Sequence, residues 1–455
     1  MEPVPLQLPP GLFRQGTELQ SAGRWYDNQY WRFAEGVIRP MKGWATGLSG
    51  TLVGAPIAAH AWLDNNEASF AAFGTATKLY AHNGTTLDDI TPSGFTSASN
   101  WSMDNFGQKL VACNGTTIYE WTPGGGGDAT AVTGAPTANA IFVTEERFLI
   151  SLGANGDPRQ FAWPDQETLT TWTPTAINQA GDLPIQATGF LVCGLKIRGS
   201  SLLFTTEGLH RLQYLGPPTV YGSEHIANGC GIVSQHAKVG VGSAAYWMGR
   251  GGFWTYAGYI EQIPCEIADD VFSNLNEAYR HLCWCEYDPT YGEVWFYYPR
   301  GAATTCSHAA IYSTRERHWN HTPMARVAGF GPEVFGWPLR VTSAGAMLKH
   351  ETGFAYDSEV RKLVSGPVQL ANGGRVVFLD EIWPDEKTRG DCEVYLYVRE
   401  YPQATETALG PYAATDRMGI MTTARQIRFE LRMASGKTDA RIGDWRALLK
   451  SRGRY

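Results

Sequence analysis

The residues that most often carry enzyme chemistry form no catalytic pattern in this chain. The sequence contains no HExxH, no GxSxG and no GxGxxG that follows a strand and opens a helix. Two acid pairs, at residues 88–89 and 269–270, fit a turn and the start of a helix. The GKT at 436–438 ends like a phosphate-binding loop, but Leu431 stands where that loop needs glycine. We therefore predict no catalytic residues.

Four cysteines and one histidine are the best candidates for a metal site: Cys265, Cys283, Cys285, Cys306 and His281. A Cys-x-Cys pair in a strand directs both side chains to one face, which a metal tolerates. Structural zinc sites, however, are usually built from Cys-x2-Cys pairs on turns. The interpretation is that these are buried, reduced thiols, and we predict neither a metal nor a cofactor.

Clustered aromatic side chains could line a sugar-binding groove. In a β-rich fold they also pack between sheets, and this second interpretation is favoured. The residues concerned are Trp25, Tyr26, Tyr30, Trp31, Trp247, Trp254, Trp295, Tyr297 and Tyr298.

The composition predicts an all-β fold. The 455 residues include 51 Gly, 25 Pro and 56 aromatic residues, and only 18% are charged. Short runs of aromatic and β-branched residues that are separated by Gly and Pro are typical of strands joined by turns. Long surface helices need more Glu, Lys, Arg and Ala. An all-α fold and a disordered chain are both excluded.

The charge is negative overall but unevenly distributed. The net charge is −7, whereas residues 425–455 carry nine Lys or Arg against three Asp or Glu. The total argues against a protein that coats nucleic acid through a basic surface. The basic end is either a solvated tail or a contact surface.

Nothing in the sequence indicates a membrane span or a secretion signal. No apolar run approaches the roughly 18 residues that cross a bilayer. The opening MEPVPLQLPPGLF has an acid and four prolines where a signal peptide has a basic flank and an apolar stretch. We expect no membrane insertion by the chain itself, and synthesis and folding in a cytoplasm.

A degenerate repeat predicts a β-propeller over residues 50–360. Each copy has a Gly- or Thr-containing turn, a short apolar-aromatic strand and a second turn, at a spacing of roughly 40–50 residues, the length of one four-stranded blade. This leaves room for about six blades, with seven as the upper count; stacked sandwiches and a β-helix are the alternatives. The copies are GTATKLYAHNG (74–84), CNGTTIYEWTPG (113–124), TTEGLHRLQYLG (205–216), GRGGFWTYAG (249–258) and SAGAMLKHETG (343–353).

Two regions depart from the repeat. Apolar residues at helical spacing in IADDVFSNLNEAYRHL (267–282) predict one amphipathic helix inserted between blades. Three longer alternating strands after residue 360 predict a separate C-terminal β-sandwich or barrel over 361–455. Residues 1–49 form an N-terminal arm.

The arm carries the most specific sequence signal. GLFRQGTELQSAGRWYDNQYWRFAEGVIRPMKGW (11–44) resembles the opening of the tail hub, or nozzle, proteins of short-tailed bacteriophages, also called packaged-DNA stabilisation proteins. Residues 271–299, residues 317–330 and the ending RQIRFELRMASGKTDARIGDWRALLKSRGRY resemble later blocks of that family, with an altered order at 441–446. The matching residues of the first block are Gly11, Phe13, Arg14, Gly16, Thr17, Gly23, Arg24, Trp25, Asp27, Arg32, Gly36, Arg39, Pro40, Gly43 and Trp44.

The resemblance implies a structural virion protein and not an enzyme. It implies a homohexameric ring below the portal and its head-to-tail adaptor, assembled in the host bacterial cytoplasm and resident in the virion tail. The ring would retain packaged double-stranded DNA and form the channel for its ejection without sequence-specific binding. Tail fibres or spikes and a needle or plug protein would dock on it.

Two sets of residues are candidate contacts. For the adaptor or a neighbouring subunit they are Arg14, Arg24, Trp25, Tyr26 and Arg39, because interface anchors are commonly aromatic or Arg. The rival hypothesis is that the arm completes the first and last blades. For a subunit contact through the basic tail the candidates are Arg441, Arg446, Arg452 and Arg454.

Two other functions compete with the nozzle. A propeller lectin or receptor-binding tail module predicts saturable glycan binding that depends on a few exposed aromatic residues. A glycan-cleaving enzyme predicts turnover that a single carboxylate change abolishes, and it would need two facing carboxylates in a cleft.

Overall fold

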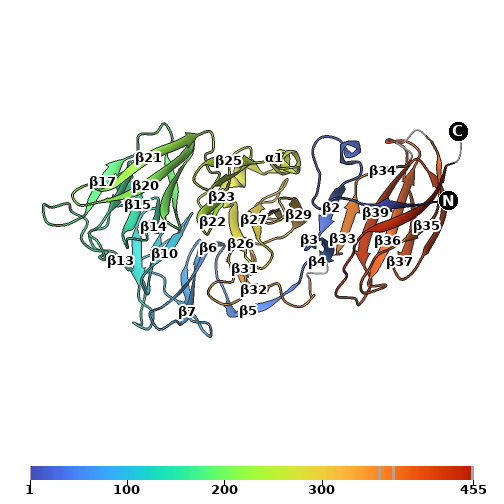
Figure 1. Ribbon diagram of the computed structural model, residues 1–455. Coiled ribbons are helices and arrows are strands. Elements are labelled where there is room, and N and C mark those ends of the chain that lie inside the picture. The colour runs from blue at the N-terminus through green and yellow to red at the C-terminus, as the bar shows by residue number, and fades with distance from the viewer. Residues whose placement is uncertain (1, 357–359, 371–374, 452–455) are drawn as a thin grey trace.

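The chain folds into two β-rich bodies that lie side by side, as Figure 1 shows. The computed structural model describes residues 2–356, 360–370 and 375–451. The first and last strands of the described chain, β1 (Glu2–Leu6) and β40 (Trp445–Ser451), pair with each other in the second body. In these described ranges no helix is both long and apolar enough to cross a membrane.

The first body consists of seven four-stranded antiparallel sheets. The first sheet contains β6 (Pro56–Leu63), β7 (Ser69–Thr75), β8 (Leu79–His82) and β9 (Leu87–Asp89). The second contains β10 (Ser102–Phe106), β11 (Lys109–Cys113), β12 (Ile118–Trp121) and β13 (Thr130–Ala131). The third contains β14 (Ala140–Val143), β15 (Leu149–Leu152), β16 (Gln160–Trp163) and β17 (Gly181–Pro184). The fourth sheet contains β18 (Leu191–Ile197), β19 (Ser200–Thr205), β20 (Gly208–Gly216) and β21 (Val220–Asn228). The fifth contains β22 (Lys238–Val241), β23 (Ala244–Met248), β24 (Phe253–Tyr256) and β25 (Ile260–Ile263). The sixth contains β26 (Trp284–Asp288), β27 (Glu293–Tyr298), β28 (His308–Ser313) and β29 (Trp319–Pro323).

The seventh sheet combines the two ends of this body. It contains β30 (Ala328–Phe330), β31 (Leu339–Val341) and β32 (Ala346–His350), and its fourth strand is β5 (Trp44–Thr51) from the N-terminal arm. The innermost strands of successive sheets contact one another, and β6 contacts both β10 and β30, so the ring is closed. The ring thus has the upper count of seven that the repeat spacing allowed, and the prediction of about six is low by one, because the third and sixth sheets contain none of the five repeat copies.

Threonines help to close the hairpins of two copies of the repeat. The Thr75 hydroxyl accepts a hydrogen bond from the backbone N–H of Lys78 at 3.0 Å. The Thr205 hydroxyl does the same for Gly208 at 2.8 Å. A side chain that satisfies the backbone three residues later stabilises a tight turn. The two copies therefore reverse the chain by the same local chemistry.

The predicted single helix is two short segments. Helix α1 (Ala268–Asn274) ends where Leu275 takes an extended conformation, and the 3-10 helix η3 (Glu277–Leu282) follows, with the Asn276 side chain accepting from its first turn. They lie between β25 and β26, at the junction of the fifth and sixth sheets. Two other 3-10 helices, η1 (Glu18–Ser21) and η2 (Ala154–Gly156), are shorter still.

The second body contains two sheets whose buried side chains belong to one core. The first sheet has the order β1 (Glu2–Leu6), β40 (Trp445–Ser451), β35 (Val377–Trp383) and β38 (Met418–Ala424). The other has the order β2 (Trp25–Gln29), β33 (Lys362–Ser365), β39 (Gln426–Met433), β36 (Cys392–Arg399) and β37 (Thr407–Ala413), and β34 (Val368–Gln369) also pairs with β39.

The N-terminal arm therefore belongs to both bodies. It gives β1 and β2 to the second body and β5 to the ring, and between them the hairpin of β3 (Trp31–Ala34) and β4 (Val37–Pro40) lies where the bodies meet (Figure 1). The predicted C-terminal unit of 361–455 is thus incomplete without two strands from the arm. The arm completes the last sheet of the ring and contributes no strand to the first.

Candidate functional site

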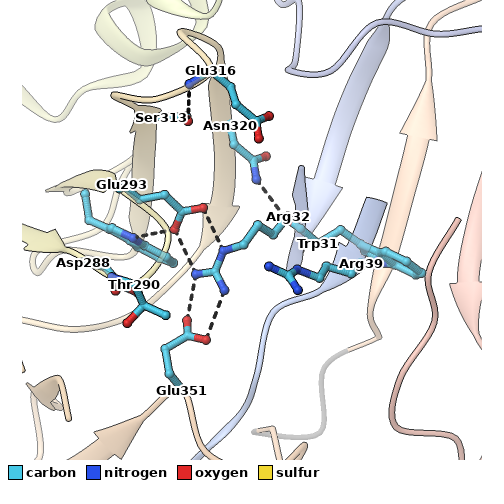
Figure 2. Close-up of polar contacts among 12 residues, drawn as sticks. Trp31, Arg32, Arg39, Asp288, Thr290, Glu293, Ser313, Glu316, Asn320 and Glu351 are labelled. Carbon is cyan, nitrogen blue, oxygen red and sulfur yellow. Dashed lines mark hydrogen bonds and ion pairs between the residues drawn. The ribbon is translucent and has the colours of Figure 1, made fainter. Parts of the chain in front are cut away.

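The hairpin of the arm places one arginine in a buried network between the two bodies. The Arg32 side chain is 1% exposed. Its Nε and Nη2 donate to the Glu293 carboxylate at 2.8 and 2.9 Å. Its Nη1 and Nη2 donate to Glu351 at 3.1 and 2.8 Å (Figure 2). The guanidinium also lies 3.6 Å from the centre of the Tyr291 ring.

The electrostatics of this site favour the ionised forms of Arg32 and Glu351, whereas burial raises the pKa of Glu293 although the Arg32 guanidinium opposes the shift. Burial alone would lower the pKa of Arg32, but the carboxylates of Glu293 and Glu351 outweigh it and hold that pKa above its ordinary value. Burial would raise the pKa of Glu351, and the Arg32 guanidinium reverses the shift and lowers it. One cation thus joins the arm to the sixth sheet through Glu293 and to the end of the seventh through Glu351.

A second buried cluster lies in the sixth and seventh sheets. Glu286 accepts from the Tyr297 hydroxyl at 2.9 Å and from the Arg340 guanidinium. His350 accepts from Arg326 Nε at 2.9 Å and stacks on Trp44, the first residue of β5. Burial raises the pKa of Glu286 to about 7, although Arg340 opposes the shift. Burial and two guanidinium groups hold the pKa of His350 well below its ordinary value, so its imidazole is neutral.

The predicted contact residues of the arm are occupied mainly by the chain's own side chains. Arg14 pairs with Asp27 at 3.2 Å and with Asp270 of α1 at 3.5 Å. Both terminal nitrogens of Arg24 donate to Glu266, at 3.1 and 2.6 Å. These pairs hold the arm against the segment that begins α1.

The other three candidates of this set lie nearby. Trp25 is 5% exposed in the shared core. Tyr26 lies under the Arg14 guanidinium at 5.3 Å. Arg39 lies 5.0 Å from the centre of the Tyr291 ring and 3.5 Å from Glu35. A contact of these residues with an adaptor stays a prediction.

Two of the four candidates in the basic tail lie in the described chain. Arg446 is exposed on β40, which lies between β1 and β35. Arg441 is half-buried and 3.9 Å from Asp439. Arg452 and Arg454 lie outside the described residues. The tail is therefore in part an interior strand of the second body, and its role in a subunit contact stays a prediction.

A cavity of about 570 Å³ opens at the mouth of the central channel of the ring. Each of the seven sheets contributes residues at or just before its innermost strand. Its lining includes Ile57, Asn100, Asn139, Leu191, Val192, Gln235, His236, Leu282 and Val327. None of the nine aromatic residues considered for a sugar-binding groove is in the lining.

The sulfur chemistry of the chain is that of unpaired thiols. All eight cysteines are free, and burial raises the pKa of Cys113 and Cys230 to about 11. Across the described ranges, no three His, Cys, Asp or Glu side chains gather in a way that could hold a metal ion.

The sheet order defines a mostly β protein with a propeller-like body, which confirms the predicted fold class in this coarse form. No family model matches the chain, and no curated protein matches its sequence.

Solved propeller structures are similar to it in outline. The β-propeller domain of Cps50 (Swd1) from Myceliophteria thermophila is 11% identical over 67% of this chain and 99% of that one, with a TM-score of 0.41. BBS1N, in a complex with ARL6DN, is 11% identical over 72% and 98%, with a TM-score of 0.43. PorZ, from the type-IX secretion system of Porphyromonas gingivalis, is 10% identical over 73% and 44%, at 0.38. At these values the likenesses say nothing of function.

Sequence reasoning did not find the role of Arg32. Its partners Glu293 and Glu351 lie 261 and 319 residues away, so no local spacing connects them. The available signal was a lone arginine inside the apolar strand WRFA.

Removal of the Arg32 charge is expected to destabilise the chain strongly. Arg32→Met leaves the carboxylates of Glu293 and Glu351 buried without a cation, which typically costs about 3–5 kcal/mol. Arg39→Met is the matched control, because Arg39 lies over the same Tyr291 ring but pairs with the exposed Glu35, and we expect a loss of at most about 1 kcal/mol. Urea unfolding measures both. Equal losses in the two variants would contradict the importance of the buried pairs.

The raised pKa of Glu286 predicts a pH dependence of stability. Between the pKa of an unfolded glutamate, about 4.3, and about 7, the folded chain binds more protons at this site than the unfolded chain. The contribution of Glu286 to stability is therefore present at low pH and lost as the pH rises through this window. Glu286→Gln should flatten the decline of the free energy of unfolding between pH 5 and 8. The exposed Glu277→Gln serves as control, and parallel profiles for all three proteins would refute the assignment.

Proposed function

We propose that this chain is a structural virion protein, a hexameric tail nozzle or hub below the portal and adaptor. In this proposal it retains the packaged DNA and forms the channel through which the DNA is ejected. One observation carries the proposal: the block with the most specific resemblance to nozzle proteins, residues 11–44, is the segment that joins the two bodies. Arg14, Arg24 and Arg32, which belong to that resemblance, make four of its long-range ion pairs.

The mechanical properties of the joint suit a wall under pressure. A buried guanidinium with two carboxylates is costly to separate, because each separated charge is left without its partner in a poorly polarisable interior. The hairpin β3–β4 is therefore held firmly against the ring. A ring that closes a DNA-filled head needs subunits whose shape does not yield.

The charge distribution suits a channel that conducts DNA. Residues 44–356 carry 26 Asp and Glu against 16 Lys and Arg. An acidic wall does not exchange counterions with phosphates, so DNA that passes it is not retained by salt-dependent binding. In the proposed ring, the basic residues of the second body are left for protein contacts, with the neighbouring subunit, the adaptor, fibres or spikes and the plug.

A propeller lectin or receptor-binding tail module is the second candidate. The cavity at the channel mouth favours it, since pockets of this size hold small ligands. A screen against a panel of glycans tests it, and saturable binding that a change at Asn139 removes would support this candidate over a purely structural role.

The copy number in purified particles tests the nozzle directly. We expect about one copy of this chain for every two portal subunits, since a six-fold ring would sit on a twelve-fold portal. Quantitative mass spectrometry with the portal protein as internal reference measures the ratio. A larger multiple would indicate a peripheral spike or fibre, and absence from particles would overturn the proposal.

A further inference from the structure

A second cavity, of about 260 Å³, lies in the central channel of the ring of sheets. Its lining comes from the innermost strands of five consecutive sheets, β6, β10, β14, β18 and β22, or from residues just before them. Gln235 and His236 line both this cavity and the cavity at the channel mouth, so the two are neighbours. We refer to the second one as the inner cavity.

Two lysines give the inner cavity its positive charge. Lys196 belongs to β18 of the fourth sheet, and Lys238 belongs to β22 of the fifth. The Lys238 ammonium donates to the carbonyl of Gln235 at 2.7 Å, and neither lysine forms an ion pair with a carboxylate of the described residues. Like charges that line one cavity repel each other, and an anion between them reverses the sign of that interaction.

Lys238 is half-buried among groups that carry no charge. The Cys193 and Cys285 thiols and the His236 imidazole all interact with its ammonium. Burial raises the pKa of both thiols, whereas burial and the ammonium lower the pKa of His236 to about 3, so all three groups are neutral at physiological pH. A charge that is taken out of water is stable in a protein when it is paired. The described chain supplies no such partner here, so a counter-ion has to come from solution.

The one carboxylate in the described lining is already in use. Asp104 Oδ2 accepts from the backbone N–H of Val143 and Oδ1 accepts from that of Asn105, both at 2.8 Å. Oδ1 also lies 4.0 Å from His60 Nε2. Burial and the Lys196 ammonium lower the pKa of His60 although Asp104 opposes them, so this imidazole adds no positive charge at physiological pH. Two lysines against one aspartate leave the lining with an excess of one positive charge.

The wider surroundings make this excess local. Among the described residues that line the mouth cavity there is no Asp, Glu, Lys or Arg. An anion that approaches from the mouth therefore meets no carboxylate there. The ring as a whole is acidic, with 26 Asp and Glu against 16 Lys and Arg over residues 44–356, so a diffuse attraction for anions is not expected. Anion binding to this chain would thus report on the two lysines.

We infer that the inner cavity binds a tetrahedral oxyanion of the phosphate class between Lys196 and Lys238. Each ammonium donates to an oxygen of the anion, which thereby joins the innermost strands of the fourth and fifth sheets. A phosphate monoester whose organic part lies in the mouth cavity carries the same group, so free phosphate and a small ester are the two sources. The inference goes beyond the proposed nozzle and does not depend on it.

Isothermal titration calorimetry of the full chain with sodium phosphate, in a chloride buffer of matched ionic strength, tests the site. Lys238→Met removes one ammonium and keeps an unbranched side chain, so phosphate should bind about tenfold or more weakly. Lys196→Met should have the same effect, and it tests the site on its own if Lys238→Met fails to fold. Lys78→Met is the matched control, because Lys78 pairs with Asp89 outside the cavity, and it should leave binding unchanged.

Adenosine 5′-monophosphate and adenosine distinguish the two sources. Tighter binding of the nucleotide than of phosphate would assign the site to an ester, and equal or weaker binding would assign it to the free anion. Adenosine that binds as tightly as the nucleotide would overturn the inference. So would a failure of phosphate and nucleotide to bind at millimolar concentration, or equal binding by the unchanged chain, Lys196→Met and Lys238→Met. The nozzle proposal is judged separately, by the copy number in particles.

Discussion

The pairing of Arg32 with Glu293 and Glu351 is the constraint on which the arrangement of the chain depends. A guanidinium at 1% exposure is stable only because two carboxylates and an aromatic face replace its water. Those carboxylates come from two different sheets of the ring, while Arg32 comes from the hairpin beside the second body. The same three side chains therefore tie the arm to two sheets of the ring.

The arm contacts the rest of the chain at several separate points besides Arg32. Arg24 holds it to Glu266, and Arg14 holds it to Asp270. The stacking of Trp44 on His350 holds it where β5 enters the seventh sheet. These attachments lie around Arg32, so the region resembles an interface between proteins that is satisfied within one chain. In the proposed role, the arm would bind an adaptor through the side chains and backbone that these ion pairs leave exposed.

The sequence allowed the ring of sheets to be predicted, because its hairpins are local. In two of the five copies, Thr75 and Thr205 close their turns with atoms three residues away. The fourth strand of the seventh sheet could not be predicted, because β5 lies some 300 residues before its partner β32. The helix over 267–282 was placed correctly, but the break at Leu275 depends on the tertiary pairing of that residue with Arg300. Buried ion pairs between distant segments, above all that of Arg32, have no local signature at all.

The exchange of strands between chain ends has a consequence for the order of folding during synthesis. The first 51 residues leave the ribosome long before β32 and Glu351 are synthesised. Strands β2 and β5 therefore have no partner strand while about six sheets of the ring are being made. Ring closure and body attachment are then among the last events, and they come together. A nascent chain interrupted before residue 351 has neither a closed ring nor a partner for Arg32, and it exposes the edge of an unfinished sheet.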